Sequence, residues 1–298
     1  MKYKIALVTN ESWHHKYWIA ELHQKLDICL VIHPRKKKSL VSKLVTIKRK
    51  KIFQYGMYRG FLKILSLIYN RIFSISRDMQ LKNLGSETFQ EFEQEYNNIP
   101  KDRFYITGTV NSEACIKKIK EHDIDFIFFL GGDIAHKEFI NSPKLRTLNF
   151  HSGISPFYNG NKTNYHAYIN EDFHLIGGTL MYMTEKIDGG KIISHTLPKI
   201  KSNDNATVIF YRNIRMAVKA YIDFIEHMSS SKILPSGIDQ EFFHNYLRNI
   251  DWGLKEDIRL FIREKKGIPS TELRDSRILH YFDNESKIPD FLLEKIGK

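Results

Sequence analysis

The chain has 298 residues, with 46 Lys and Arg, 34 Asp and Glu, 42% hydrophobic residues and 13% aromatic residues. This length suits one large domain or two small ones, and the apolar and aromatic fractions argue against a disordered chain. Thirteen cations and no Asp or Glu lie between Arg35 and Arg77, so the net charge of +12 leaves about −1 for the other 255 residues. A basic charge confined to one segment argues against a nucleic-acid partner.

Two further features bear on the cellular compartment. No run of about 18 uncharged apolar residues occurs, which argues against a membrane-spanning helix. The apolar stretch at the N-terminus is too short for a signal peptide. Cys29 and Cys115 lie far apart in apolar stretches. We therefore expect a cytoplasmic chain with buried thiols, without a disulfide or a cysteine-based zinc site.

The first predicted elements are a strand over residues 3–9, a helix from Ser12 to Leu26, and a second strand over residues 27–32 that Pro34 ends. Strand, helix and strand within about 33 residues form a βαβ unit, which implies a parallel sheet.

A helical insertion is predicted over residues 35–100. Apolar residues recur at helical spacing between Phe61 and Phe73, and acidic residues return between Glu87 and Glu95. Three alternatives stand for the basic residues 35–77: a solvated helical face, a contact with an anionic membrane surface, or a phosphate-binding face for a substrate. The stretch from Phe61 to Phe73 is expected in the core or in a subunit interface, which favours a homodimer.

The alternation of strands and helices then resumes. We predict a helix capped by Ser112, strands over residues 125–130, 145–150, 178–183 and 191–197, a long amphipathic helix over 207–228, and several short helices beyond Pro235. The predicted fold is α/β, with a mostly parallel twisted sheet. Residues 1–204 would form the catalytic core that carries the insertion, and residues 205–298 a helical C-terminal region.

Polar residues gather where three of these strands end. They are Gly131-Gly132-Asp133, Asn149-Phe-His151, and residues 185–190. Ligands of open parallel sheets bind at the carboxyl ends of the strands. Asn149 and His151 are two residues apart and would share one face. An amide and an imidazole there can stabilise an oxyanion and move a proton, and Asp188 could orient the imidazole. Each feature alone also fits a capping Asn, a structural His or an Asp-Gly turn.

Together these motifs resemble those of the 10-formyltetrahydrofolate-dependent formyltransferases, most closely the sugar N-formyltransferases of bacterial surface-polysaccharide pathways. The resemblance lies in Asn149-x-His151, Ser155-Pro156-x-Tyr158-x-Gly160, Gly178-Thr179 and Asp188-x-Gly190, in that order. It implies a Rossmann-like core and a catalytic triad. In that triad Asn149 would donate to the developing oxyanion. Protonated His151, held by Asp188, would stabilise the same oxyanion, and Asp188 would accept the proton of the attacking amine.

The resemblance also implies binding residues. Backbone groups of two loops would hold the folate: Phe129, Leu130, Gly131, Gly132, Asp133 and Ile134 in the first, and Met183, Glu185, Lys186 and Ile187 in the second. The substrate would contact Ser152, Gly153, Ser155, Pro156, Tyr158 and Asn164. No metal is expected, because the histidines are scattered without ligand spacing. Asn159, His166 and Met181 depart from the residues usual in the family, which bears on substrate recognition and not on the triad.

The predicted function is transfer of a formyl group from 10-formyltetrahydrofolate to the primary amine of a small substrate. A nucleotide-linked amino sugar, such as a 4-amino-4,6-dideoxyhexose, fits the resemblance best. The alternatives are formylation of methionyl-tRNA or another amine, hydrolysis of the folate itself, and a non-catalytic protein of this fold that binds a membrane or a partner.

Overall fold

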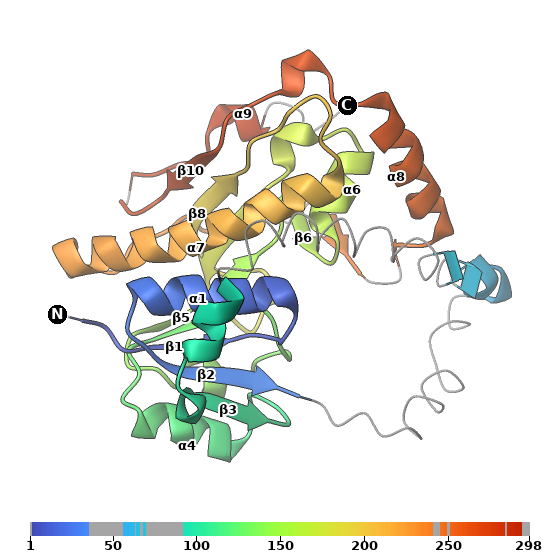
Figure 1. Cartoon of the computed structure of the whole chain (residues 1–298). Helices are drawn as coiled ribbons and strands as arrows, with labels where there is room; N and C mark the ends of the chain where they lie inside the picture. The colour runs from blue at the N-terminus through green and yellow to red at the C-terminus, as the bar shows by residue number, and fades with distance from the viewer. Residues whose placement is uncertain are drawn as a thin grey trace.

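A computed structural model describes residues 2–35, 56–62, 64–65, 68–69, 92–240, 245–248, 251–283 and 285–293 (Figure 1). Within the predicted insertion, residues 57–62 and 92–98 are helical. The rest of that prediction lies mainly outside the described residues. Across the part of the chain that is described, no helix is long and apolar enough to cross a membrane.

One eight-stranded sheet forms the centre of the molecule, in the order β10-β8-β7-β5-β4-β1-β2-β3. Its strands are β1 (Ile5–Val8), β2 (Ile28–Pro34), β3 (Phe104–Thr107), β4 (Phe126–Phe129), β5 (Arg146–His151), β7 (Gly178–Tyr182), β8 (Ile192–Leu197) and β10 (Arg277–His280). The five neighbouring strands β5, β4, β1, β2 and β3 pair in parallel with one another. The pairs β5–β7, β7–β8 and β8–β10 are antiparallel. The mostly parallel α/β sheet predicted from the sequence is confirmed.

Helices cover both faces of the sheet. They are α1 (Trp13–Lys25), α4 (Glu113–Glu121), α5 (Lys137–Ile140), α6 (Thr163–Ile169), α7 (Ala206–Ser231), α8 (Leu254–Lys266) and α9 (Asp290–Leu293), with short 3-10 turns at Lys101–Arg103, Phe173–Leu175 and Ser270–Glu272. Figure 1 shows α1 and α7 together on one side of the sheet and α4 on the other. Strands β1 and β4 are buried along their whole length, which explains why they read as continuous apolar runs.

Local signals positioned several of these elements as predicted. The Ser112 side chain accepts a hydrogen bond from the Cys115 N–H at 3.3 Å and so caps α4. Against the other face of the sheet, Trp18 of α1 meets Tyr221 of α7 edge to face, with ring centroids 5.2 Å apart. The first contact stabilises the start of α4 on one face of the sheet, and the second holds α1 against α7 on the other face.

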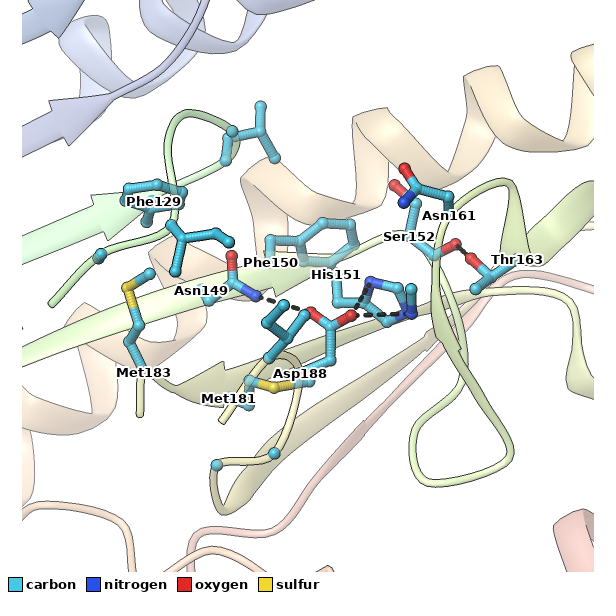
Figure 2. A pocket seen from close by; sticks show the side chains of 18 of the residues that line it. Phe129, Asn149, Phe150, His151, Ser152, Asn161, Thr163, Met181, Met183 and Asp188 are labelled. Carbon is cyan, nitrogen blue, oxygen red and sulfur yellow. Dashed lines mark hydrogen bonds and ion pairs between the residues drawn. The ribbon is translucent and has the colours of Figure 1, made fainter. Parts of the chain in front are cut away.

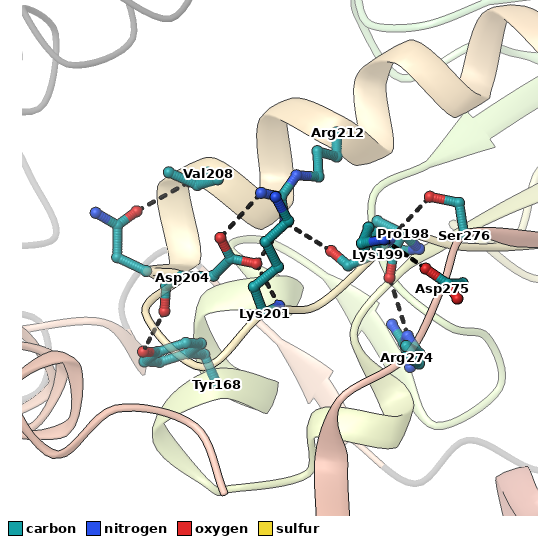
Figure 3. Close-up of polar contacts among 11 residues, drawn as sticks. Tyr168, Pro198, Lys199, Lys201, Asp204, Val208, Arg212, Arg274, Asp275 and Ser276 are labelled. Atoms are coloured by element: carbon teal, nitrogen blue, oxygen red, sulfur yellow. Dashed lines mark hydrogen bonds and ion pairs between the residues drawn. The ribbon is translucent and has the colours of Figure 1, made fainter. Parts of the chain in front are cut away.

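The connection from β8 to α7 is held by polar contacts (Figure 3). The Asn205 side chain accepts from the Val208 N–H at 2.9 Å and caps α7. Arg212 donates to the Asp204 carboxylate and, at 2.8 Å, to the Lys199 carbonyl. Arg274, just before β10, donates to the Pro198 carbonyl at 3.0 Å and so ties the C-terminal region to the same connection.

The C-terminal region contains strands besides the predicted helices. Strand β10 pairs antiparallel with β8, and β9 (Asn245–Leu247) pairs in parallel with β6 (Tyr158–Gly160) in a small second sheet. Both β6 and β9 have three residues, too few to show a strand period in the sequence. The β6–β9 pairing brings residues 245–247 against the segment that follows β5.

Candidate active site

Asn149 and His151, in the last half of β5, lie together with Asp188 of the loop between β7 and β8 (Figure 2). The Asn149 Nδ2 donates to Asp188 Oδ1 at 3.4 Å, and His151 Nδ1 lies 3.4 Å from Asp188 Oδ2. The side chains of His151 and Asp188 are 7% and 10% exposed, so water screens their ion pair weakly. The strand places the first two residues on one face, and the loop between β7 and β8 supplies the carboxylate.

Both ring nitrogens of His151 face acceptors. Nε2 lies 2.9 Å from the Tyr158 carbonyl oxygen, which can only accept, so Nε2 carries a proton. Nδ1 faces the Asp188 carboxylate. With Nδ1 also protonated, the ring would be an imidazolium whose two N–H groups both face acceptors.

Asp188 is positioned by contacts from distant parts of the chain. Its carboxylate accepts the Gly160 N–H at 2.9 Å, and its backbone is in the left-handed region at φ 51°. Gln240, 52 residues further on, donates through Nε2 to the carbonyls of Asp188 at 2.9 Å and Gly190 at 2.6 Å. A Cβ at Gly190 would lie 1.7 Å from the Tyr182 carbonyl oxygen, so only glycine fits there.

A cavity of about 540 Å³ opens beside these residues. Its lining includes all the residues predicted to bind folate: Phe129, Leu130, Gly131, Gly132, Asp133, Ile134, Met183, Glu185, Lys186 and Ile187. A volume of this size is typical of small-molecule sites. The role of these ten residues in binding a folate stays a prediction.

The predicted substrate residues divide into two groups. Ser152 and Asn164 line the cavity, whereas Gly153, Ser155, Pro156 and Tyr158 are buried and do not line it. Ser155 Oγ donates to Asn159 Oδ1 at 2.5 Å, and the Tyr158 hydroxyl donates to Asp172. Burial and the Asp172 carboxylate raise the pKa of Tyr158, so its hydroxyl keeps the proton that it donates. In this structure Ser155 and Tyr158 therefore stabilise the segment after β5 through internal hydrogen bonds and do not face the cavity.

A buried histidine braces the same loop. His195 Nε2 donates to the Ser155 carbonyl at 2.9 Å, and its Nδ1 lies 2.9 Å from the Tyr281 hydroxyl. Because the carbonyl can only accept, Nε2 carries the proton and Nδ1 accepts from Tyr281. Burial lowers the pKa of His195 to about 4 and keeps the ring neutral.

Sequence reasoning missed one wall of the cavity. Asn161, Lys162, Tyr165, Phe210 and Tyr246 line it, and the Lys162 ammonium lies 4.5 Å from the centre of the Trp252 ring. Asn161, Lys162 and Tyr165 directly follow the Ser-Pro motif and flank the predicted Asn164, so they could have been included on that basis. Phe210 and Tyr246 are brought in by α7 and β9, and nothing local in the sequence indicates their place.

Within the described residues, no group of three or more His, Cys, Asp or Glu side chains is placed to hold a metal ion. The side chains that the cavity does offer are an amide, an imidazole and a carboxylate, which suit acid–base and oxyanion chemistry.

Sequence comparisons match this chain to a family and to a relative. The model of a family described as formyl transferase matches residues 77–225, half of the chain. A methionyl-tRNA formyltransferase of Mycoplasmopsis pulmonis is 33% identical over 109 residues, which cover 36% of this chain and 37% of that relative. The match thus spans well under half of the relative's length.

Solved structures share the fold over a longer stretch. A sugar N-formyltransferase from a Shewanella species superposes with a TM-score of 0.51 at 14% identity and covers 88% of this chain and 87% of its own. A glycinamide ribonucleotide transformylase from Symbiobacterium toebii gives a TM-score of 0.51 at 12% identity, over 80% of this chain and 93% of its own. At such identities the likeness concerns the fold and does not select among the substrates.

Proposed function

This chain belongs to the formyl transferase family, and on that premise we propose that it transfers a formyl group from 10-formyltetrahydrofolate to the primary amine of a nucleotide-linked amino sugar. The observation that carries the proposal is the Asn149–His151–Asp188 group at the wall of the cavity. A protein that only bound a partner would have no physical need for these three side chains in mutual contact.

The cavity wall fits a folate. Gly131 and Gly132 leave the backbone of their loop bare, and a Cβ at Gly132 would meet the Phe129 ring at 2.9 Å. Bare backbone N–H and C=O groups can pair with the edge of a pterin ring. Ile134 and Ile187, which are 65% and 43% exposed, offer apolar surface on the two loops. The bound folate would supply the activated formyl group.

The triad residues would then act on that group. Asn149 uses one N–H on Asp188, and its second N–H can donate to the formyl oxygen as negative charge develops there. As the amine nitrogen bonds to the formyl carbon, Asp188 can accept the proton of the amine, directly or through a water molecule. The bond from the formyl carbon to the folate nitrogen would then break, and that nitrogen would take up the proton. His151, as an imidazolium, balances the charge of Asp188 and favours negative charge on the formyl oxygen. Both ring nitrogens of His151 already face acceptors. His151 can therefore take part in the proton transfer only if Asp188 moves away from Nδ1.

A small acceptor is supported by the C-terminal region. The described residues after α7 return to the core, where β10 extends the main sheet and β9 pairs with β6. For a methionyl-tRNA formyltransferase, the family resemblance would imply a β-barrel domain in that position. Methionyl-tRNA remains the second candidate acceptor, favoured by the 33% identity to such enzymes.

Under either candidate we propose a cytoplasmic homodimer, with the basic residues 35–77 available for a weak contact with an anionic membrane.

Thermal stability measured against two panels of ligands tests the proposal. A ligand at 100 times its dissociation constant should add about 2.7 kcal/mol to the free energy of unfolding. We expect a clear rise with 5-formyltetrahydrofolate and a further rise with one class of nucleotide-linked sugar. A His151→Ala variant should keep the folate response and lose formyl transfer. No response to any folate, or full activity in the variant, would refute the proposal.

A further inference from the structure

The outward side of α8 carries an unusual combination of side chains. Its exposed residues are Lys255, Ile258, Arg259, Phe261, Ile262, Lys265 and Lys266, which we call the α8 face. Three are large and apolar, with exposed fractions of 45%, 51% and 50% for Ile258, Phe261 and Ile262. The other four are cations, and none is acidic. At about 100° per residue the seven positions fall within one arc of roughly 160°.

The helix behind this face is firmly anchored. Leu260 is fully buried, and the Arg263 guanidinium lies 4.8 Å from the centre of the Phe173 ring and donates to the Gly267 carbonyl at 2.8 Å. Just before the helix, Trp252 Nε1 donates to Asp257 Oδ1 at 2.8 Å. The orientation of the α8 face is therefore set by the fold, and its apolar side chains cannot turn inward without breaking these contacts.

A second group of exposed apolar side chains lies in the described residues 56–62 of the basic segment. Met57, Tyr58 and Phe61 are 81%, 75% and 57% exposed. In Figure 1 the short light-blue helical segment that contains residues 57–62 and the helix α8 both lie at the right-hand edge of the molecule. The thirteen cations and no acids between Arg35 and Arg77 give this group the same chemical character as the α8 face.

We propose that the α8 face docks on an anionic lipid bilayer. Basic amphipathic helices bind in the plane of such bilayers, with apolar side chains in the interface and cations among the headgroups. Lys and Arg can keep their charge in water while their stems cover apolar surface. The Lys265 ammonium, 5.6 Å from the centre of the Phe261 ring, already shows cation and apolar groups packed in one surface.

Charge argues against two other occupants. A twofold contact between two copies of the α8 face would set four cations against four cations, because the same patch meets itself. A nucleic acid would satisfy the cations and leave three large apolar side chains without a partner, whereas a bilayer accommodates both. The proposal does not depend on formyl transfer, so its failure would leave the proposed function untouched.

Co-sedimentation of the full-length chain with vesicles tests the proposal. The two preparations are pure phosphatidylcholine and phosphatidylcholine with about one third phosphatidylglycerol. We expect pelleting with the anionic vesicles alone, weakened by added salt. Each cation at a bilayer surface strengthens binding about fivefold. The Lys265→Gln/Lys266→Gln variant should therefore bind about 25-fold more weakly, and Phe261→Ser/Ile262→Ser should lose at least tenfold.

Matched control variants separate the α8 face from general charge and hydrophobicity. Ile106→Ser/Ile233→Ser changes two apolar residues that are 54% and 70% exposed elsewhere, and Lys117→Gln/Lys120→Gln removes two exposed cations of α4. Both controls should pellet like the wild type. Equal pelleting with both vesicle types would overturn the proposal. Undiminished binding by both α8 variants would also overturn it, because the basic segment would then act alone. Binding of RNA in place of vesicles would also overturn the proposal.

Discussion

Replacing Gln240 by Met should slow catalysis strongly and lower stability moderately. Met keeps an unbranched side chain of similar length and removes both N–H donors from the Asp188 and Gly190 carbonyls, which lie at 2.9 Å and 2.6 Å. Each such bond is worth about 1 kcal/mol net, so the loop loses about 2 kcal/mol of restraint. The left-handed backbone of Asp188, at φ 51°, costs about 1–2 kcal/mol for a residue with a Cβ. Without Gln240 the loop should therefore relax.

The kinetic effect follows from the position of the carboxylate. A displacement of about 1 Å in a catalytic group can cost about 100-fold in rate. We expect kcat for formyl transfer to fall about 10- to 100-fold in Gln240→Met, with the folate dissociation constant changed less than about threefold. The melting temperature should fall by less than roughly 8 °C. The matched control is Asp239→Asn, which removes only the exposed ion pair to Lys191 and should act like the wild type.

A double-mutant cycle distinguishes positioning from a general structural role. If Gln240 acts through Asp188, adding Gln240→Met to Asp188→Asn should cause little further loss of kcat. Additive losses in the double variant, or a wild-type kcat in Gln240→Met, would refute the reasoning.

Two predictions concern stability. His195 has its pKa lowered to about 4 by burial, whereas an exposed or unfolded histidine titrates near 6.5. Between these values the unfolded chain binds a proton that the folded chain does not, so stability should fall as pH drops from 6.5 toward 4, by up to about 1.4 kcal/mol per pH unit from this residue. Urea unfolding across that range should show a shallower dependence in His195→Gln, and equal slopes would contradict the assignment. Separately, Arg274 donates to the carbonyls of Pro198, Phe173, His174 and Ile176. Arg274→Lys keeps the charge but cannot reach all four, so unfolding at pH 7 should require about 2–4 kcal/mol less; a change below about 0.5 kcal/mol would count against this role.

The sequence was most informative where local pattern and burial coincide. The buried runs of β1 and β4 and the Ser112 cap were all readable, because each depends on a few neighbouring residues. The two-residue spacing of Asn149 and His151 placed them on one face, and both line the cavity. The family resemblance then supplied Asp188, which no local rule distinguishes from an ordinary turn.

What could not be predicted depends on contacts between distant residues. Gln240 reaches Asp188 across 52 positions, and Tyr281 reaches His195 across 86. Neither residue lies in a motif. Ser155 and Tyr158 were predicted to contact substrate, yet in the structure they are buried and do not line the cavity, whereas Lys162 and Tyr165 do. Which side of a loop faces a cavity is decided by tertiary packing and not by the loop's own sequence.

Gln240 positions the Asp188 loop, and Tyr281 positions the Ser155 carbonyl through His195. These contacts have a consequence for genetic screens, because Gln240 and Tyr281 both lie beyond the 77–225 stretch that matches the family model. A random mutagenesis screen for inactive alleles should therefore recover changes well outside that stretch, around residues 240 and 281 as well as at the triad. An alignment restricted to the family stretch would leave such alleles unexplained.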